Sequence, residues 1–99
     1  MFAAPPVIET KLFVDVNTVH GIQDHPSEWA GLLFGRPNTP SFLEGPSFDR
    51  AGNLWLVDVA RGRLFRVTPE GGIDIACEYE GEPNGLAFHK DGHGVIADH

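Results

Sequence analysis

The sequence predicts an all-β fold made of short antiparallel strands. Two observations lead to this class: from residue 42 onward, short runs of strand-forming residues alternate with glycine-rich turns, and the whole pattern restarts after 40 residues. The 99 residues are 41% hydrophobic and 21% charged, which is ordinary for one small globular domain. We therefore divide the chain into an irregular N-terminal arm, residues 1–41, and a β-domain, residues 42–99.

Prolines interrupt the N-terminal arm before its apolar runs reach the length of most strands or helices. Residues 7–16 (VIETKLFVDV) are nevertheless predicted to form a strand. Residues 24–33 (DHPSEWAGLL) are predicted to form one or two helical turns, with Asp24 or Ser27 as the cap. Three apolar side chains of these turns are expected to pack against the rest of the protein: Trp29, Leu32 and Leu33.

Four consecutive strands are predicted over residues 42–79. Their sequences are LEGPSFD, LWLVDV, RLFRV and IDIACEY, and the turns between them are DRAGN, ARG and TPEGG. Turns this short join neighbouring strands as antiparallel hairpins, so the four strands should form a meander. The single Cys77 has no partner for an internal disulfide and is expected to be a buried thiol of the fourth strand.

The pattern returns with a constant spacing of 40 residues. Four residues recur identically at this spacing: Gly45, Phe48, Gly52 and Asp58 as Gly85, Phe88, Gly92 and Asp98. A four-stranded unit of about 40 residues is typical of a β-propeller blade. The chain is therefore predicted to be a fragment of a β-propeller, about one and a half blades long, with the first hairpin of the second blade at residues 84–98. The turns that contain Gly52 and Gly92 should be equivalent.

Glu44 and Asn84 stand 40 residues apart, each at the entrance of the first strand of a unit. The first strand of every propeller blade lines the central channel, so both side chains are expected to face one cavity. A buried carboxylate without a partner is costly, so Glu44 calls for a cation or a basic residue. Oxygen donors without nearby cysteine or paired histidine favour calcium, magnesium or manganese over structural zinc. The alternative is a glutamate solvated in a loop.

Four segments resemble the SMP-30/gluconolactonase/luciferin-regenerating-enzyme-like family: SFLEGPSFD, GNLWLVDV, GRLFRVTPEG and EYEGEPNGLAFHKDG. The resemblance covers about residues 41–98 and implies a six-bladed propeller that hydrolyses lactones with a bound divalent cation. It implies that Glu44, in the EGP motif, is a metal ligand and that Asn84 is a substrate-binding residue. Calcium is the expected cation, with zinc and magnesium as alternatives. The family's other ligands and its general base come from later blades, so no catalytic residue is assigned.

The expected function is thus metal-dependent hydrolysis of a sugar lactone, a small-molecule substrate. A divalent cation polarises the lactone carbonyl or activates water, while a carboxylate removes the proton. The 99-residue chain is expected to be an inactive truncated fragment that self-associates through its unfinished blade. A noncatalytic propeller that binds protein or ligand is the alternative from another class, because fold does not fix function.

Charge and motif patterns exclude other classes. The net charge of −7 argues against nucleic-acid binding, which needs a positive surface. The N-terminus has no basic start followed by a long apolar run, so neither a signal peptide nor a membrane span is expected, and the predicted location is cytoplasmic. The five histidines lack the spacing of a zinc site, and His89 and His93 are expected to be solvated.

Several other side chains are given structural roles. Asp58 and Asp98 are expected to hydrogen-bond a neighbouring turn, whereas Trp55 and Phe65 should fill the core between blades. Three arginines are expected to pair with acids of the last strand and its exit: Arg61, Arg63 and Arg66 with Glu78, Glu80 and Glu82.

Overall fold

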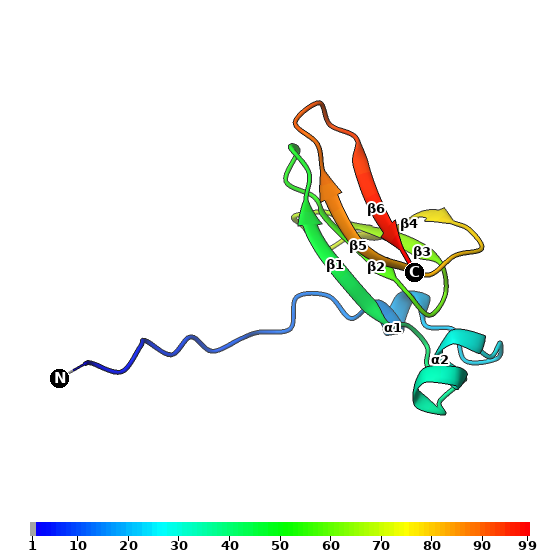
Figure 1. The fold of residues 1–99 in the computed structure, drawn as a ribbon. Coiled ribbons are helices and arrows are strands. Elements are labelled where there is room, and N and C mark those ends of the chain that lie inside the picture. Colours follow the sequence, from blue (N-terminus) through cyan, green and yellow to red (C-terminus); the bar gives the residue numbers. More distant parts are fainter. Residues whose placement is uncertain (1) are drawn as a thin grey trace.

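Residues 2–99 are described by a computed structural model (Figure 1). The arm carries two short helices, α1 (Val16–His20) and α2 (Glu28–Phe34). Six strands follow: β1 (Leu43–Phe48), β2 (Leu54–Asp58), β3 (Arg63–Val67), β4 (Ile73–Glu78), β5 (Pro83–Phe88) and β6 (Gly94–Asp98). β1 to β4 form one antiparallel sheet in chain order, and β5 and β6 form a separate hairpin. The all-β class is confirmed; that the two sheets belong to a propeller stays a prediction, because the strands described form no closed sheet.

The two hairpins β1–β2 and β5–β6 repeat one register. The residue pairs at both ends of the first ladder recur 40 residues later: Leu43 with Asp58 as Pro83 with Asp98, and Phe48 with Leu54 as Phe88 with Gly94. Gly52 (φ 86°) and Gly92 (φ 99°) both adopt the left-handed conformation that favours glycine. The predicted equivalence of the two turns is therefore confirmed.

The aspartate that ends each second strand holds the entrance of the first strand. Asp58 Oδ1 accepts a hydrogen bond from the Phe42 backbone N–H at 2.8 Å. Asp98 Oδ1 accepts the equivalent bond from the Glu82 N–H at 3.1 Å. The structural role predicted for both carboxylates is confirmed, and the repeat extends one residue before the strands themselves.

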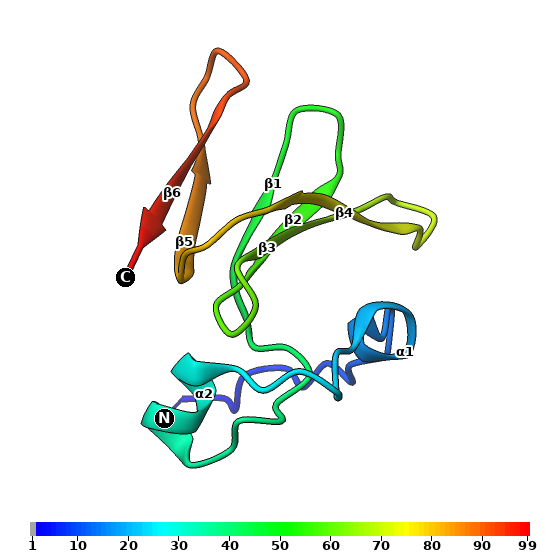
Figure 2. The same cartoon turned by 90° about the vertical axis from the view of Figure 1, so that its right-hand side faces the viewer.

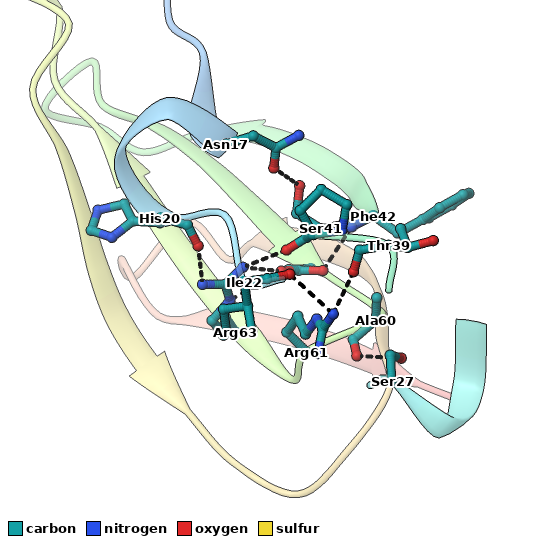
Figure 3. Close-up of polar contacts among 12 residues, drawn as sticks. Asn17, His20, Ile22, Ser27, Thr39, Ser41, Phe42, Ala60, Arg61 and Arg63 are labelled. Carbon is teal, nitrogen blue, oxygen red and sulfur yellow. Dashed lines mark hydrogen bonds and ion pairs between the residues drawn. The ribbon is translucent and has the colours of Figure 1, made fainter. Parts of the chain in front are cut away.

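A buried ion pair joins β2 to β3. Arg63 is only 2% exposed, and its Nε and Nη2 donate to Asp58 Oδ2 at 3.0 and 2.7 Å. The remaining N–H groups reach the arm, because Nη1 donates to the His20 carbonyl at 2.7 Å and Nη2 to the Pro40 carbonyl at 3.3 Å (Figure 3). The expected pairing of Arg63 with a surface glutamate is wrong: Asp58 and Glu78 both stand opposite Arg63 in the two registers, but the guanidinium bonds the buried Asp58.

Arg61 in the β2–β3 turn also binds the arm rather than an acid. Its Nη2 donates to the carbonyl oxygens of Thr39 at 2.6 Å and Ile22 at 3.2 Å (Figure 3). Its Nη1 donates to the carbonyl of His25. Arg66 pairs with Asp74 on β4 at 3.1 Å, in an exposed position. The acidic partners predicted for both arginines are thus wrong: the arm supplies carbonyl acceptors to Arg61, and Asp74 stands opposite Arg66 in the β3–β4 register.

Helix α2 begins where the sequence predicts. Ser27 is its N-cap: Ser27 Oγ accepts the Ala30 N–H at 3.2 Å and donates to the Ala60 carbonyl at 2.7 Å. Trp29 packs, as expected, against other aromatic rings of the protein. The packing expected of Leu32 and Leu33 is wrong, since they are 79% and 58% exposed.

The strand predicted at residues 7–16 is wrong. Residues 2–15 have no regular structure and run away from the body of the protein (Figure 1). Val7 and Ile8 are 92% and 85% exposed, and no strand lies beside them to complete a hydrogen-bonded ladder. Asp15 instead caps α1, accepting the Asn17 N–H at 3.0 Å.

The two faces of the four-stranded sheet have different covers. Trp55 packs edge-to-face on Phe88 of β5 with ring centroids 5.7 Å apart, so its predicted place between the two units is confirmed. Its indole donates to Asp49, and this bond and that from Asn53 lower the pKa of Asp49 to about 2. Phe65 is fully buried but on the other face, where it stacks on His20 of α1 at 5.6 Å. Its predicted place between blades is therefore corrected: the arm covers it.

Two further predictions concern single side chains. Cys77 lies on a strand but is exposed, because β4 is the last strand of its sheet and nearly all its residues face solvent. His89 and His93 are exposed at the β5–β6 turn, as predicted.

None of the helices within residues 2–99 is long and apolar enough to cross a membrane. The cytoplasmic location stays a prediction.

Tyr79 links the end of β4 to the end of β6. Its hydroxyl donates a hydrogen bond to the Asp98 carboxylate, which also accepts the Glu82 N–H. Although 38% of the residue remains exposed, partial burial raises the pKa of Tyr79 to about 12, and the bond to anionic Asp98 acts in the same direction. The contact therefore ties the hairpin to the four-stranded sheet.

Replacing Asp58 by Asn should lower the free energy of unfolding by about 3–5 kcal/mol, because the buried Arg63 would lose its counter-charge. Asp74→Asn is the matched control, since it breaks the exposed pair with Arg66 and should cost less than about 1 kcal/mol. Urea unfolding followed by circular dichroism measures both. Similar small losses in the two variants would contradict the structural importance of the buried pair.

Tyr79 is the only tyrosine, so its ionisation can be followed by ultraviolet absorbance alone. We expect a midpoint near pH 12 in the folded chain and near the ordinary value of about 10 in denaturant. Because the folded pKa is raised, the stability from this contact is fully present below pH of about 10 and is lost as the pH rises through about 12. Asp98→Asn should move the folded midpoint down towards 10; an unchanged midpoint would show that Asp98 has no part in it.

Candidate functional site

Glu44 is the second residue of β1 and is half-buried. It lies opposite Val57 of β2, and directly after it the register shifts by a β-bulge between Glu44 and Ser47. Gly45, with φ 57°, adopts the left-handed conformation that such a bulge requires. The local sequence Glu-Gly-Pro therefore bends the entrance of β1 just where the carboxylate stands.

Gly45 also lets β1 approach β5 closely. A Cβ atom at this position would lie 2.8 Å from the Leu86 nitrogen and 3.2 Å from the Asn84 carbonyl oxygen, so no side chain fits. The first strands of the two units consequently run side by side (Figures 1 and 2). The structure thus brings the backbone next to Glu44 against the backbone of Asn84, residues 40 positions apart in the sequence.

Asn84 is the second residue of β5 and is exposed. It lies within the equivalent bulge, because the β5–β6 register shifts between Pro83 and Gly85. The two bulges differ: Val57 pairs with Glu44 whereas Ala97 pairs with Gly85, and only Gly45 has positive φ. A Cβ at Gly85 would make only an ordinary contact, 3.5 Å from the Ala97 Cβ. Within residues 2–99 neither the Glu44 carboxylate nor the Asn84 amide has an ion pair or a side-chain hydrogen bond, so both are available to a ligand.

The oxygen atoms of Glu44 and Asn84 are of the kind that calcium and magnesium prefer. Calcium, however, takes about six to eight oxygen ligands. Among the residues that the structure describes, no three or more His, Cys, Asp or Glu side chains gather where they could hold a metal ion. Glu44 fits a cation site as one contributor, and the described part of the chain does not complete such a site.

A pocket close to Glu44 was not predicted from the sequence. It has a volume of about 360 Å³ and lies between the end of α2 and the entrance of β1, lined by Phe34, Arg36, Thr39 and Phe42. It forms because the arm folds back against β1, a contact that no local pattern encodes. The only signal in the sequence is that the arm gathers aromatic residues around Arg36.

Comparison with known proteins finds relatives that match about half of this chain. The relatives matched are lactonases of Staphylococcus aureus. Lactonase drp35 of strains RF122/ET3-1 and MRSA252 is 42% identical over 53 residues, which make up 50% of this chain and 16% of the relative. The lactonase drp35 of strain USA300 is 40% identical over the same length.

These matches confirm the resemblance to the SMP-30/gluconolactonase family that the sequence motifs indicate. The matched part spans only 16% of the length of the curated relatives. No family model matches the sequence, and no solved structure matches it closely. The roles of Glu44 and Asn84 remain predictions.

Gly45→Ala should destabilise the chain more than Gly52→Ala does. Both glycines have positive φ, so an alanine at either position incurs a backbone cost of about 1–2 kcal/mol. Only at position 45 would the new methyl group also meet backbone, at 2.8 Å, whereas nothing lies within 4 Å at position 52. Urea unfolding of the two variants measures the difference. Equal losses would show that β1 and β5 do not need this close approach.

Proposed function

We propose that the chain is the opening part of a β-propeller hydrolase that opens sugar lactones with the help of a divalent cation. The observation that carries the proposal is the 40–42% identity to lactonases over 53 residues. The repeat of register between the two hairpins supports the propeller, because blades are equivalent units placed side by side.

In this proposal Glu44 supplies one carboxylate ligand to the cation, with calcium as the best match and zinc or magnesium as alternatives. The Glu44 carboxylate is half-buried and has no basic partner within residues 2–99, so a bound cation would offset its negative charge. The cation, when bound, polarises the lactone carbonyl or lowers the pKa of water. The other ligands belong to segments outside these 99 residues.

Asn84 has the role of a substrate-binding residue. Its amide can donate and accept hydrogen bonds, which suits a sugar hydroxyl group, and its backbone adjoins that of Gly45. Hydrolysis forms a bond between water oxygen and the carbonyl carbon and breaks the ring C–O bond, giving a hydroxy acid. The base that takes the water proton is also assigned to a segment outside these residues.

The chain alone is proposed to be inactive and to self-associate. β6 has no strand on its outer side within residues 2–99. Apolar side chains of the hairpin, Leu86, Val95 and Ile96, line an open hollow of about 340 Å³. An unpaired strand edge next to apolar surface favours association with another strand.

Glu44→Gln in the full-length protein tests the assignment. The change keeps the volume but removes the negative charge, so the calcium concentration for half-maximal gluconolactone hydrolysis should rise at least about tenfold, and excess calcium should restore part of the rate. Glu70→Gln, in the exposed β3–β4 turn, is the matched control and should change neither the calcium requirement nor the rate of hydrolysis. Hydrolysis is followed across calcium and zinc titrations.

Unchanged activity and metal dependence in Glu44→Gln would reject the role of Glu44. Metal binding without any turnover in the full-length wild type would instead favour the noncatalytic binding module. The 99-residue chain, assayed beside the full-length protein, should show no hydrolysis above buffer.

A further inference from the structure

The pocket between α2 and β1 has an aromatic wall. Phe34, the last residue of α2, stacks on Phe42 with ring centroids 5.3 Å apart and an interplanar angle of 17°. Trp29 meets both rings edge-on, at 5.4 and 5.2 Å. Phe34 and Phe42 thus give the pocket of about 360 Å³ an apolar surface, and Trp29 packs against both rings.

Arg36 supplies the only charge in the lining of this pocket. Its side chain is exposed, and within residues 2–99 its guanidinium forms no ion pair, although the chain carries a net charge of −7. The backbone around it is well held: the Arg36 N–H donates to the Ala30 carbonyl at 3.3 Å, and Thr39 donates to the Arg36 carbonyl through N–H at 3.1 Å and Oγ1 at 2.8 Å. A fixed turn thus presents an unpaired cation.

The pocket adjoins the entrance of β1, because Phe42, which lines it, directly precedes this strand and stands two residues before Glu44. The Phe42 backbone is held there: its N–H donates to the Asp58 carboxylate at 2.8 Å, and its carbonyl accepts the Val59 N–H at 2.9 Å. Two residues of a strand span roughly 7 Å. A ligand held at Glu44 is therefore within reach of Phe42.

We propose that this pocket binds a carboxylate group carried on an apolar or aryl substituent of the lactone substrate. The carboxylate pairs with the planar guanidinium of Arg36, and the apolar part lies against Phe34 and Phe42. The pocket depends on no metal and exists within this chain; that its ligand is part of a lactone rests on the proposed function. The substrate class is thus a lactone with a second, anionic group.

The 99-residue chain can be tested directly with two small lactones that differ only in charge, phthalide-5-carboxylate and phthalide. The wild-type chain should bind the carboxylate roughly two- to fivefold more tightly, the gain expected from a pair with an exposed guanidinium. The indole N–H signal of Trp29 in a ¹H–¹⁵N spectrum should shift on titration, while that of Trp55, bonded to Asp49, should not.

Arg36→Gln should abolish the preference for the carboxylate, leaving both lactones with similar weak affinity. Arg50→Gln is the matched control: Arg50 is another exposed arginine, at the far turn between β1 and β2, and its loss should leave the preference intact. Equal affinity of the wild type for both lactones, no binding of either, or an equal effect of the two substitutions would overturn the proposal.

The experiments distinguish a failure of the pocket proposal from a failure of the lactonase proposal. If Glu44→Gln impairs full-length hydrolysis while Arg36→Gln leaves carboxylate binding unchanged, the binding role of the pocket is rejected and the lactonase assignment is retained. If Arg36 governs carboxylate binding while Glu44→Gln leaves hydrolysis unchanged, the pocket stands as an anion site and the role of Glu44 fails.

Discussion

The Asp58 carboxylate is the interaction on which the rest of the structure depends. One oxygen holds the Phe42 N–H at the entrance of β1, and the other holds Arg63 of β3, in a fully buried position. Arg63 in turn binds the carbonyl oxygens of His20 and Pro40. One buried charge therefore fixes three segments at once, and because its hydrogen bonds are satisfied, burial of the pair is tolerable. The positions of Phe42 and Glu44 follow from it.

The second unit uses the same aspartate with a different partner. Asp98 keeps the bond to the backbone at the strand entrance, but its other oxygen accepts the hydroxyl of Tyr79, and this bond is the main cause that lowers the pKa of Asp98. The backbone bond is therefore the invariant part of the repeat. The side-chain partner can change according to what lies next to each unit: the arm at Asp58, and the end of β4 at Asp98.

Local patterns predicted most of the β-domain. Strand order, turns and the 40-residue repeat are encoded by alternation and by glycines at positive φ, and Ser27 was identified by its capping chemistry. The arm was not predictable in the same way. Residues 7–16 have strand-forming composition but no neighbouring strand, and Arg61 and Arg63 bind backbone carbonyls, which every residue carries. For the same reason the pocket at Arg36 could be found only in the folded chain.

The close contact at Gly45 limits how far β1 and β5 lie apart, and so how near the two repeated units would lie to the axis of a propeller. β1 and β5 belong to different sheets, yet at Gly45 they approach so closely that a Cβ would lie 2.8 Å from the Leu86 nitrogen. A side chain here would act as a wedge that moves the two strands apart and widens the ring of inner strands. The span between Glu44 and Asn84, and hence the size of molecule that could bridge them, is then set by the absence of a single methyl group.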